Sequence, residues 1–181
     1  PGLDLPSLGI SRTLYLHYVE NSTAFDGIAI RDHWRMTLTG DGEPERVMAS
    51  SVSPSFFRVL GVPPLHGRTF SEEEAQPGGP DVAVLSHGLW QRRFGGDRGI
   101  LGQVIQGEGL SYEVVGVLPE SFVDDQPVEI YRPRQIDPAR AQLGAFSDQA
   151  IARIAAGSSL EQARADLERL TAGLEEWFPE D

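Results

Sequence analysis

Residues 82–97, VAVLSHGLWQRRFGGD, carry the clearest fold signal in the chain. The first four are apolar and predict a short buried strand, and Ser86 stands where a helix N-cap is expected. Residues 87–94 predict the helix itself, and the glycines at 95 and 96 end it. The stretch therefore predicts one unit in which a strand leads through a serine into a helix.

Two other segments have the same order of strand, serine and helix. Residues 47–52 lead into Ser53, and residues 149–156 lead into Ser158, which forms a capping box with Glu161. Strand-then-helix units of this kind indicate a mixed α+β architecture.

The ends of two further helices are also predicted. Pro54 stands at the first position of the helix that follows Ser53, and Gly61 lies just past its end. Ser71 and Glu74 form a second capping box on a short acidic helix.

The remaining segments complete a mixed pattern, with residues 1–11 as a flexible lead-in and residues 133–145 as a connector. The other predicted elements are a helix that includes 14–19, Phe25 and Ile28, a strand at 28–39, a turn at 40–44, a hairpin of 103–105 with 111–117, and a strand at 127–131.

The last predicted helix has the most regular spacing. Its apolar residues recur at alternating steps of three and four, which places them on one stripe. The stripe consists of Leu160, Ala163, Leu167, Leu170, Leu174 and Trp177. We expect this stripe to face the core rather than a coiled-coil partner. On that basis Leu167→Ala should lower the free energy of unfolding by about 2–5 kcal/mol.

Composition excludes several classes of function. The chain has 181 residues, with 15 basic and 27 acidic side chains and a formal net charge of −12. This charge argues against binding to nucleic acid or to anionic lipid. Cysteine is absent, which excludes disulfides, thiol nucleophiles and thiolate metal sites. Neither a membrane-helix run nor a signal-peptide pattern is found, so we expect an excised soluble segment of a longer protein.

Ser86, His87 and the nearby Asp81 are the residues that suggest a hydrolase. The G-x-S-x-G motif is missing, however, and a role as helix cap already explains Ser86. A catalytic triad is also an arrangement in space, for which adjacency in the sequence argues little. We therefore predict no catalytic residue.

Metal and cofactor sites are not predicted either. The histidines lack the spacing of metal ligands, and the acidic runs at 72–74 and 124–125 lack that of a calcium loop. We interpret the first run as favourable charge at a helix N-terminus and the second as a solvated loop. Arg92 and Arg93, between Trp90 and Phe94, are expected to be solvated beside packed aromatic rings. Substrate-binding residues stay unassigned.

Several blocks in fixed order resemble one known family. They are VSPSFFRVLGV at 52–62, GRTF at 67–70, VAVLSHGLWQRRFGGD at 82–97, LG at 101–102, YEVVGVLP at 112–119, ARI at 152–154 and GSSLEQA at 157–163. Their order and spacing are similar to the periplasmic core domain of MacB-type ABC transporter permeases. Residues 129–133 depart from the family, whose members usually have an Asp-x-Trp-x-Pro segment there.

The resemblance implies an architecture and a function. It implies a two-lobed domain, with residues 12–60 and 140–181 in a porter-like β–α lobe and residues 61–139 in a smaller β-rich, Sabre-like lobe. It implies a non-catalytic domain at the periplasmic face of the bacterial inner membrane, anchored by membrane helices outside this chain. The implied partners are a second permease copy, an ABC ATPase domain or subunit, and a periplasmic adaptor.

Two alternatives remain open at this point. One is a free-standing secreted hydrolase that uses Ser86 and His87, which requires an exposed pocket with both side chains aimed into it. The other is a passive ligand-binding module, which requires a sizeable enclosed pocket between the lobes. We also expect the isolated domain to be a monomer, because removal from the membrane ends the high effective concentration of a second copy.

Overall fold

The computed structural model describes residues 9–40, 42–141 and 145–172. Within them it has helices and strands in mixed order, which confirms the predicted α+β class. The helices are α1 (Arg12–Asn21), α2 (Phe56–Leu60), α3 (His87–Phe94) and α4 (Leu160–Ala172), with a 3-10 turn at Arg98–Ile100. The strands are β1 (Phe25–Thr39), β2 (Glu45–Val52), β3 (His66–Gly67), β4 (Val82–Leu85), β5 (Val104–Gly107), β6 (Leu110–Val117), β7 (Val128–Pro133) and β8 (Gln149–Ile154).

Strand β1 connects the whole sheet. It pairs with β2 over Arg31 to Leu38 and with β5 at Leu38 and Thr39. Strand β2 continues to β7, β4, β6 and β5, so the pairings form a closed ring of six strands. Strand β8 lies outside this ring and pairs with β1 from Phe25 to Arg31. Arg31 is therefore the residue at which the pairing of β1 passes from β8 to β2.

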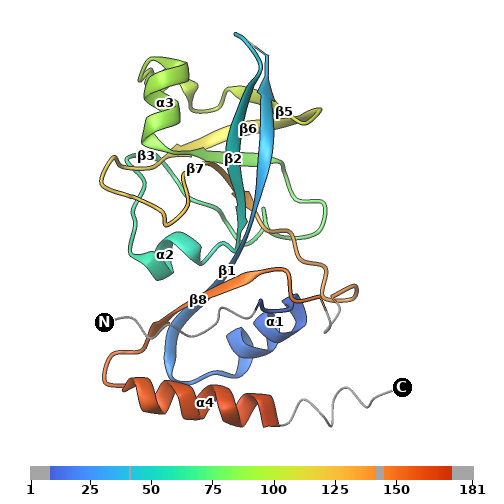
Figure 1. Cartoon of the computed structure of the whole chain (residues 1–181), viewed down its shortest axis with the longest axis vertical. Coiled ribbons are helices and arrows are strands. Elements are labelled where there is room, and N and C mark those ends of the chain that lie inside the picture. Colours follow the sequence, from blue (N-terminus) through green and yellow to red (C-terminus); the bar gives the residue numbers. More distant parts are fainter. Residues whose placement is uncertain (1–8, 41, 142–144, 173–181) are drawn as a thin grey trace.

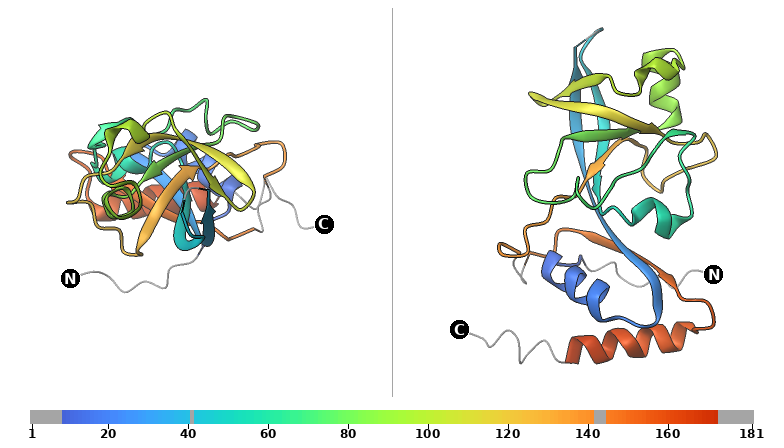
Figure 2. Two further views of the ribbon diagram at one scale, coloured as in Figure 1. Left: turned by 90° about the horizontal axis from the view of Figure 1, so that it is seen from above. Right: turned by 180° about the vertical axis from the view of Figure 1, so that it is seen from behind.

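The molecule is elongated along β1 and has two parts (Figures 1 and 2). The terminal part consists of α1, β1 up to residue 30, β8 and α4, and it contains the ends of the described chain. The distal part consists of the ring of strands with α2, α3 and β3. We call the junction between them, at Arg31, the waist.

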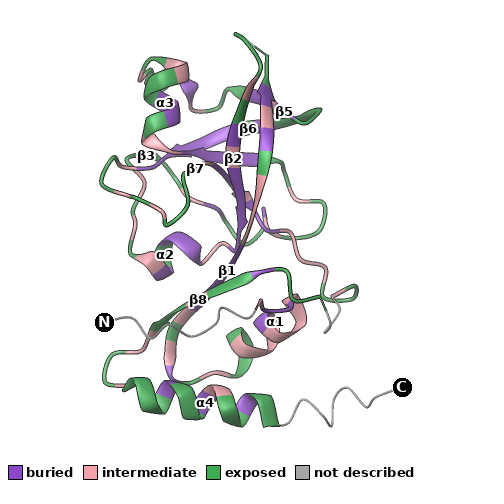
Figure 3. Cartoon of the chain, viewed as in Figure 1, coloured by how far each residue is buried: buried purple, intermediate pink, exposed green. Residues whose placement is uncertain are grey.

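Apolar residues form three clusters, and the aromatic one around α2 extends across the waist to Ala29 of β1 and Ile151 of β8. In the terminal part Ile28 and Ile30 pack with Tyr15 of α1. The distal part has one cluster under α3 and a second, aromatic cluster around α2, where the rings of Phe57 and Tyr131 meet edge-on at 5.2 Å. Burial is concentrated in the distal strands, whereas most of α4 is exposed (Figure 3).

Local signals in the sequence predicted several elements correctly. The side chain of Ser86 accepts a hydrogen bond from the Leu89 N–H and begins α3, and Gly95 ends it in the left-handed conformation. The predicted hairpin turns at Glu108 and Gly109, both with positive φ, as a tight two-residue turn between β5 and β6 requires.

Other local predictions were wrong. Residues 72–75 form turns and not a short acidic helix, and α2 begins at Phe56, so Pro54 does not hold its first position. Phe25 and Ile28 belong to β1, because α1 ends at Asn21. Ser53 does not cap α2; its hydroxyl accepts the buried N–H of Ile30 instead, which ties the end of β2 to β1. The last capping box lies one residue later than predicted and joins Ser159 to Gln162.

The apolar stripe of α4 is only partly buried. Ala163 and Leu170 face the core, but Leu160 is 55% exposed and Leu167 is half-buried. The predicted stripe was therefore wrong at Leu160, which lies on the first turn beyond the reach of the core. The predicted members Leu174 and Trp177 lie outside the described residues.

Candidate functional site

The structure does not bring Ser86, His87 and Asp81 together. The Ser86 hydroxyl is engaged at the start of α3, 3.2 Å from the Leu89 nitrogen. The His87 ring packs edge-on against Trp90, with 5.5 Å between ring centroids. Asp81 precedes β4 and Ser86 follows it, so this extended strand separates them by roughly 16 Å. This spacing does not allow a Ser–His–Asp triad.

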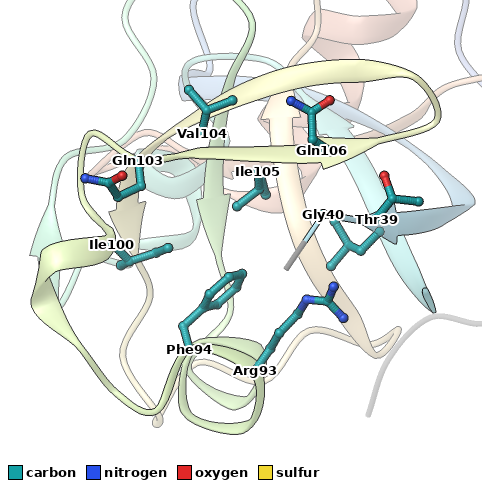
Figure 4. Close-up of a pocket in the computed structure, with 10 residues that line it drawn as sticks. Thr39, Gly40, Arg93, Phe94, Ile100, Gln103, Val104, Ile105 and Gln106 are labelled. Atoms are coloured by element: carbon teal, nitrogen blue, oxygen red, sulfur yellow. The ribbon is translucent and has the colours of Figure 1, made fainter. Parts of the chain in front are cut away.

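A cavity of about 390 Å³ lies at the distal end of the molecule (Figure 4). It lies between the end of β1, the end of α3 and the β5 segment, and not at the waist. Leu38, Phe94, Ile100 and Ile105 supply its apolar lining. By the bounds inferred from the family, residues 38–40 of its lining belong to the porter-like lobe and residues 93–106 to the Sabre-like lobe, so the cavity lies between the two predicted lobes and the ligand-binding alternative stays open.

The arginines of α3 bind carboxylates and are not simply solvated. Arg92 lies 2.6 Å from Glu45 and 2.8 Å from Glu129, and Arg93 lies 3.3 Å from Glu45. The hydrogen bond from Arg92 holds the pKa of Glu45 below its ordinary value. These contacts join α3 to β2 and β7 within the distal part.

The most unusual polar cluster lies at the waist, on one face of β1. The guanidinium of Arg31 is 7% exposed and donates hydrogen bonds of 2.6 Å to both Asp124 and Asp125. Its Nε donates to the side chain of Gln149 in β8, at 3.2 Å. One guanidinium thus joins β1, a loop of the distal part and the first residue of β8.

Asp124 was predicted to lie in a solvated loop, and this was wrong. Its side chain is 5% exposed and accepts hydrogen bonds from Arg31 and from the Tyr131 hydroxyl, at 2.8 Å for the latter. Burial, together with the nearby Asp124 carboxylate, raises the pKa of Tyr131. The hydrogen bond from Arg31 lowers the pKa of Asp125 to about 2. For Arg31 itself, burial lowers the pKa, but its bonds to Asp125 and Asp124 outweigh burial and raise it.

A second guanidinium occupies the opposite face of β1. Arg134 follows β7 and donates to the Ser51 hydroxyl at 2.9 Å, with Asp32 of β1 at 3.4 Å. Its Nη2 lies 2.6 Å from Oδ1 of the fully buried Asp148 and forms an ion pair with it. Arg12, at the start of α1, approaches the same carboxylate at 3.5 Å.

Sequence reasoning missed both clusters. Arg31 and Asp124 are 93 positions apart, and no spacing rule connects such residues. The available signal was weaker: Arg31 comes directly after the apolar residues 28–30 and directly before the charged Asp32. A charged residue on a buried strand indicates that a partner of opposite charge is present, but not which residue it is. Across the residues that the structure describes, no group of histidines and carboxylates is arranged to hold a metal ion.

One family model and several solved structures are similar to this chain. A family model described as the MacB-like periplasmic core domain matches residues 9–170. The periplasmic region of MacB from Actinobacillus actinomycetemcomitans is similar in structure, with a TM-score of 0.72 and 15% identity, over 93% of this chain and 76% of that one. The extracellular domain of the noncanonic ABC-type transporter YknZ from Gram-positive bacteria has a TM-score of 0.67 and 18% identity, over 95% and 87% respectively. No curated protein sequence matches the chain.

Proposed function

The chain belongs to the MacB-like periplasmic core domain family, and from this membership we propose that it couples ATP-driven movement of membrane helices to substrate export or to signal transmission. In this proposal it is a non-catalytic, extracytoplasmic domain of an ABC transporter permease. ATP hydrolysis takes place in a separate domain or subunit.

The position of the chain ends is the observation that best supports the proposal. Helices α1 and α4, nearest to the two described ends, touch in the terminal part, where the His17 ring lies 3.3 Å from the Leu170 carbonyl. Strand β1 runs without interruption from there to the far tip of the molecule (Figure 1). Force that enters through both chain ends therefore has one continuous strand along which to reach the distal end.

The proposed setting is the periplasmic face of the bacterial inner membrane. Among the described residues no helix is long and apolar enough to cross a membrane, and we propose that flanking segments provide the anchor. The proposed partners are a second permease copy, an ABC ATPase and a periplasmic adaptor. Nucleic acid is not a partner, in keeping with the charge of −12.

The lobe boundaries inferred from the family stay a prediction. Residues 12–60 with 140–181, and residues 61–139, are proposed to correspond to the porter-like and Sabre-like lobes. This division differs from the terminal and distal parts, because β2 pairs with β7 and α2 packs in the aromatic cluster of the distal part.

An accessibility experiment tests the proposed location. The chain has no cysteine, so Glu168→Cys, on the exposed face of α4, introduces the one thiol of this domain, and the permease without the substitution is the control for labelling elsewhere. In intact cells with a permeabilised outer membrane, a membrane-impermeant maleimide should label this thiol in the membrane-bound permease. Labelling that occurs only after the cells are lysed would place the domain in the cytoplasm and overturn the proposal.

A further inference from the structure

We infer that Arg31 and Arg134 clamp the waist from both faces of β1, so that the terminal and distal parts move as one rigid body. The biological meaning of this clamp rests on the proposed coupling function. The clamp itself is a property of the 181-residue chain and is open to test without a membrane or an ATPase.

The two clusters lie on opposite faces of β1. Neighbouring residues of a strand point to opposite faces, and Arg31 and Asp32 are neighbours at the residue where β1 changes partners. Arg31 binds Asp124 and Asp125 on one face, whereas Asp32 approaches Arg134 on the other. A bend of β1 toward either face would therefore pull one of the two clusters apart.

Each cluster includes a residue from each part. On the first face, Asp124 and Asp125 belong to the distal part, and Gln149 is the first residue of β8 in the terminal part. On the second face, Ser51 and Arg134 belong to the distal part, and Asp148 precedes β8. Neither cluster serves only to stabilise one part.

Charged side chains of both clusters are buried. Arg31, Asp124 and Asp148 are almost or fully removed from solvent, so salt screens their attraction far less than at a surface. A shift of the two parts that separated either pair without admitting water would leave a charge buried without its partner, which is among the most costly changes in a protein interior. The waist therefore resists opening more strongly than the β1–β8 pairing alone.

Amide hydrogen exchange on the isolated chain tests the clamp. The double variant R31M/D124N removes both charges of the buried pair on one face while it keeps the bulk of each side chain, and R134M/D148N does the same on the other face. Each should accelerate exchange of β8 by roughly 10-fold, because partners such as Gln149, Asp125 and Ser51 lose their hydrogen-bond donor, and should leave β4 of the distal part almost unchanged. The matched control is R68M/E74Q, which removes an ion pair with a buried carboxylate that lies wholly within the distal part. This control should not accelerate β8 selectively.

Two results would overturn the inference. One is equal acceleration of β8 and β4, which would mean that the arginines stabilise the whole fold and do not clamp its parts. The other is unchanged exchange of β8 in folded variants. If a double variant fails to fold, the milder Asp125→Asn, at a side chain that is 62% exposed, should still accelerate β8 selectively, by a few-fold. Failure of the clamp would leave the maleimide result untouched, so the two proposals fail separately.

Discussion

At the scale of single residues, buried carboxylates determine how the elements are held together. Asp166 illustrates this, because the predicted stripe of α4 contained only apolar residues and yet Asp166 is buried on the same helix. It accepts the backbone N–H groups of Thr23 and Ala24, at 2.8 and 3.0 Å, and pairs with Arg169 at 2.6 Å. The turn between α1 and β1 is therefore fastened to α4 through one carboxylate.

Replacement of Asp166 should loosen this attachment. Asp166→Ala leaves two backbone donors without their acceptor, and we expect it to lower the free energy of unfolding by about 1–3 kcal/mol. Urea denaturation followed by circular dichroism measures the change. Glu168→Ala, at an exposed position two residues later, is the control and should have almost no effect. Equal effects of the two substitutions would contradict this role of Asp166.

The Arg31–Asp125 pair should make stability depend on pH. The pKa of Asp125 in the folded chain is lowered from 3.8 to about 2, mainly by the hydrogen bond from Arg31. Protons therefore bind the unfolded chain first as the pH falls, so the stabilisation is complete above about pH 5 and is lost between about pH 4 and pH 2. The difference in unfolding free energy between the parent and Asp125→Asn should shrink over that range. A difference that stays constant from pH 6 to pH 2 would show that the pair does not form.

Whether a contact made by a single residue could be predicted depends on how far apart the two partners lie along the chain. The cap at Ser86 and the reciprocal hydrogen bonds of Ser71 with Glu74 were predicted correctly, because each bonds within three residues, although residues 72–75 are turns and not the expected helix. The waist was missed because Arg31 and Asp124 meet only after the ring of strands has closed. Local chemistry is visible in a sequence, whereas long-range ion pairs depend on a topology that spacing does not reveal.

At the scale of elements, α3 and α4 differ in how much local sequence could predict. Local residues define the bounds of α3, whereas the packing of α4 depends on distant parts of the chain. Both bounds of α3 were predicted correctly, because a serine and a glycine define them. For α4 the periodicity predicted the helix, but it did not show how far the core extends along it. Strand β8 covers one side of β1 in the terminal part, and the first turn of α4 projects beyond this small core.

Leucine truncations along α4 should reveal where its core contact begins. Leu170 is buried, so Leu170→Ala should cost about 2–5 kcal/mol of unfolding free energy. Leu160 is exposed, so Leu160→Ala should stay within about 0.5 kcal/mol. Leu167 is half-buried, so the cost of Leu167→Ala should lie between those two values. It should be smaller than the cost of about 2–5 kcal/mol expected from its spacing alone. Thermal unfolding orders the three variants, and a Leu160 effect as large as that of Leu170 would contradict the observed packing.

At the scale of the whole molecule, the resemblance of ordered sequence blocks predicted the family and the α+β class correctly. Those blocks form caps, turns and aromatic core, so they indicate the shape of the domain. The distal cavity beside Phe94 was not predicted, because its lining comes from three separate segments that meet only in the folded chain.

The isolated chain should be a monomer at micromolar concentration. Two copies each carry a formal charge of −12 and repel one another, and the membrane tether that would raise their effective concentration is absent. Sedimentation velocity at physiological salt, where the Debye length is about 8 Å, provides the measurement. A stable dimer under these conditions would mean that the domain itself, rather than its anchor, drives pairing.

Movement at the chain ends is proposed to reach the distal tip through β1, and distances measured across the two permease copies test this most directly. Spin labels on single cysteines, at Glu168 of the terminal part or at Gln106 beside the distal cavity, report the movement of each end. In the membrane-embedded permease with its ATPase, ATP should change both distances together, and R31M/D124N should abolish the change at Gln106 alone. A change at Glu168 with none at Gln106 in the parent protein would contradict the account.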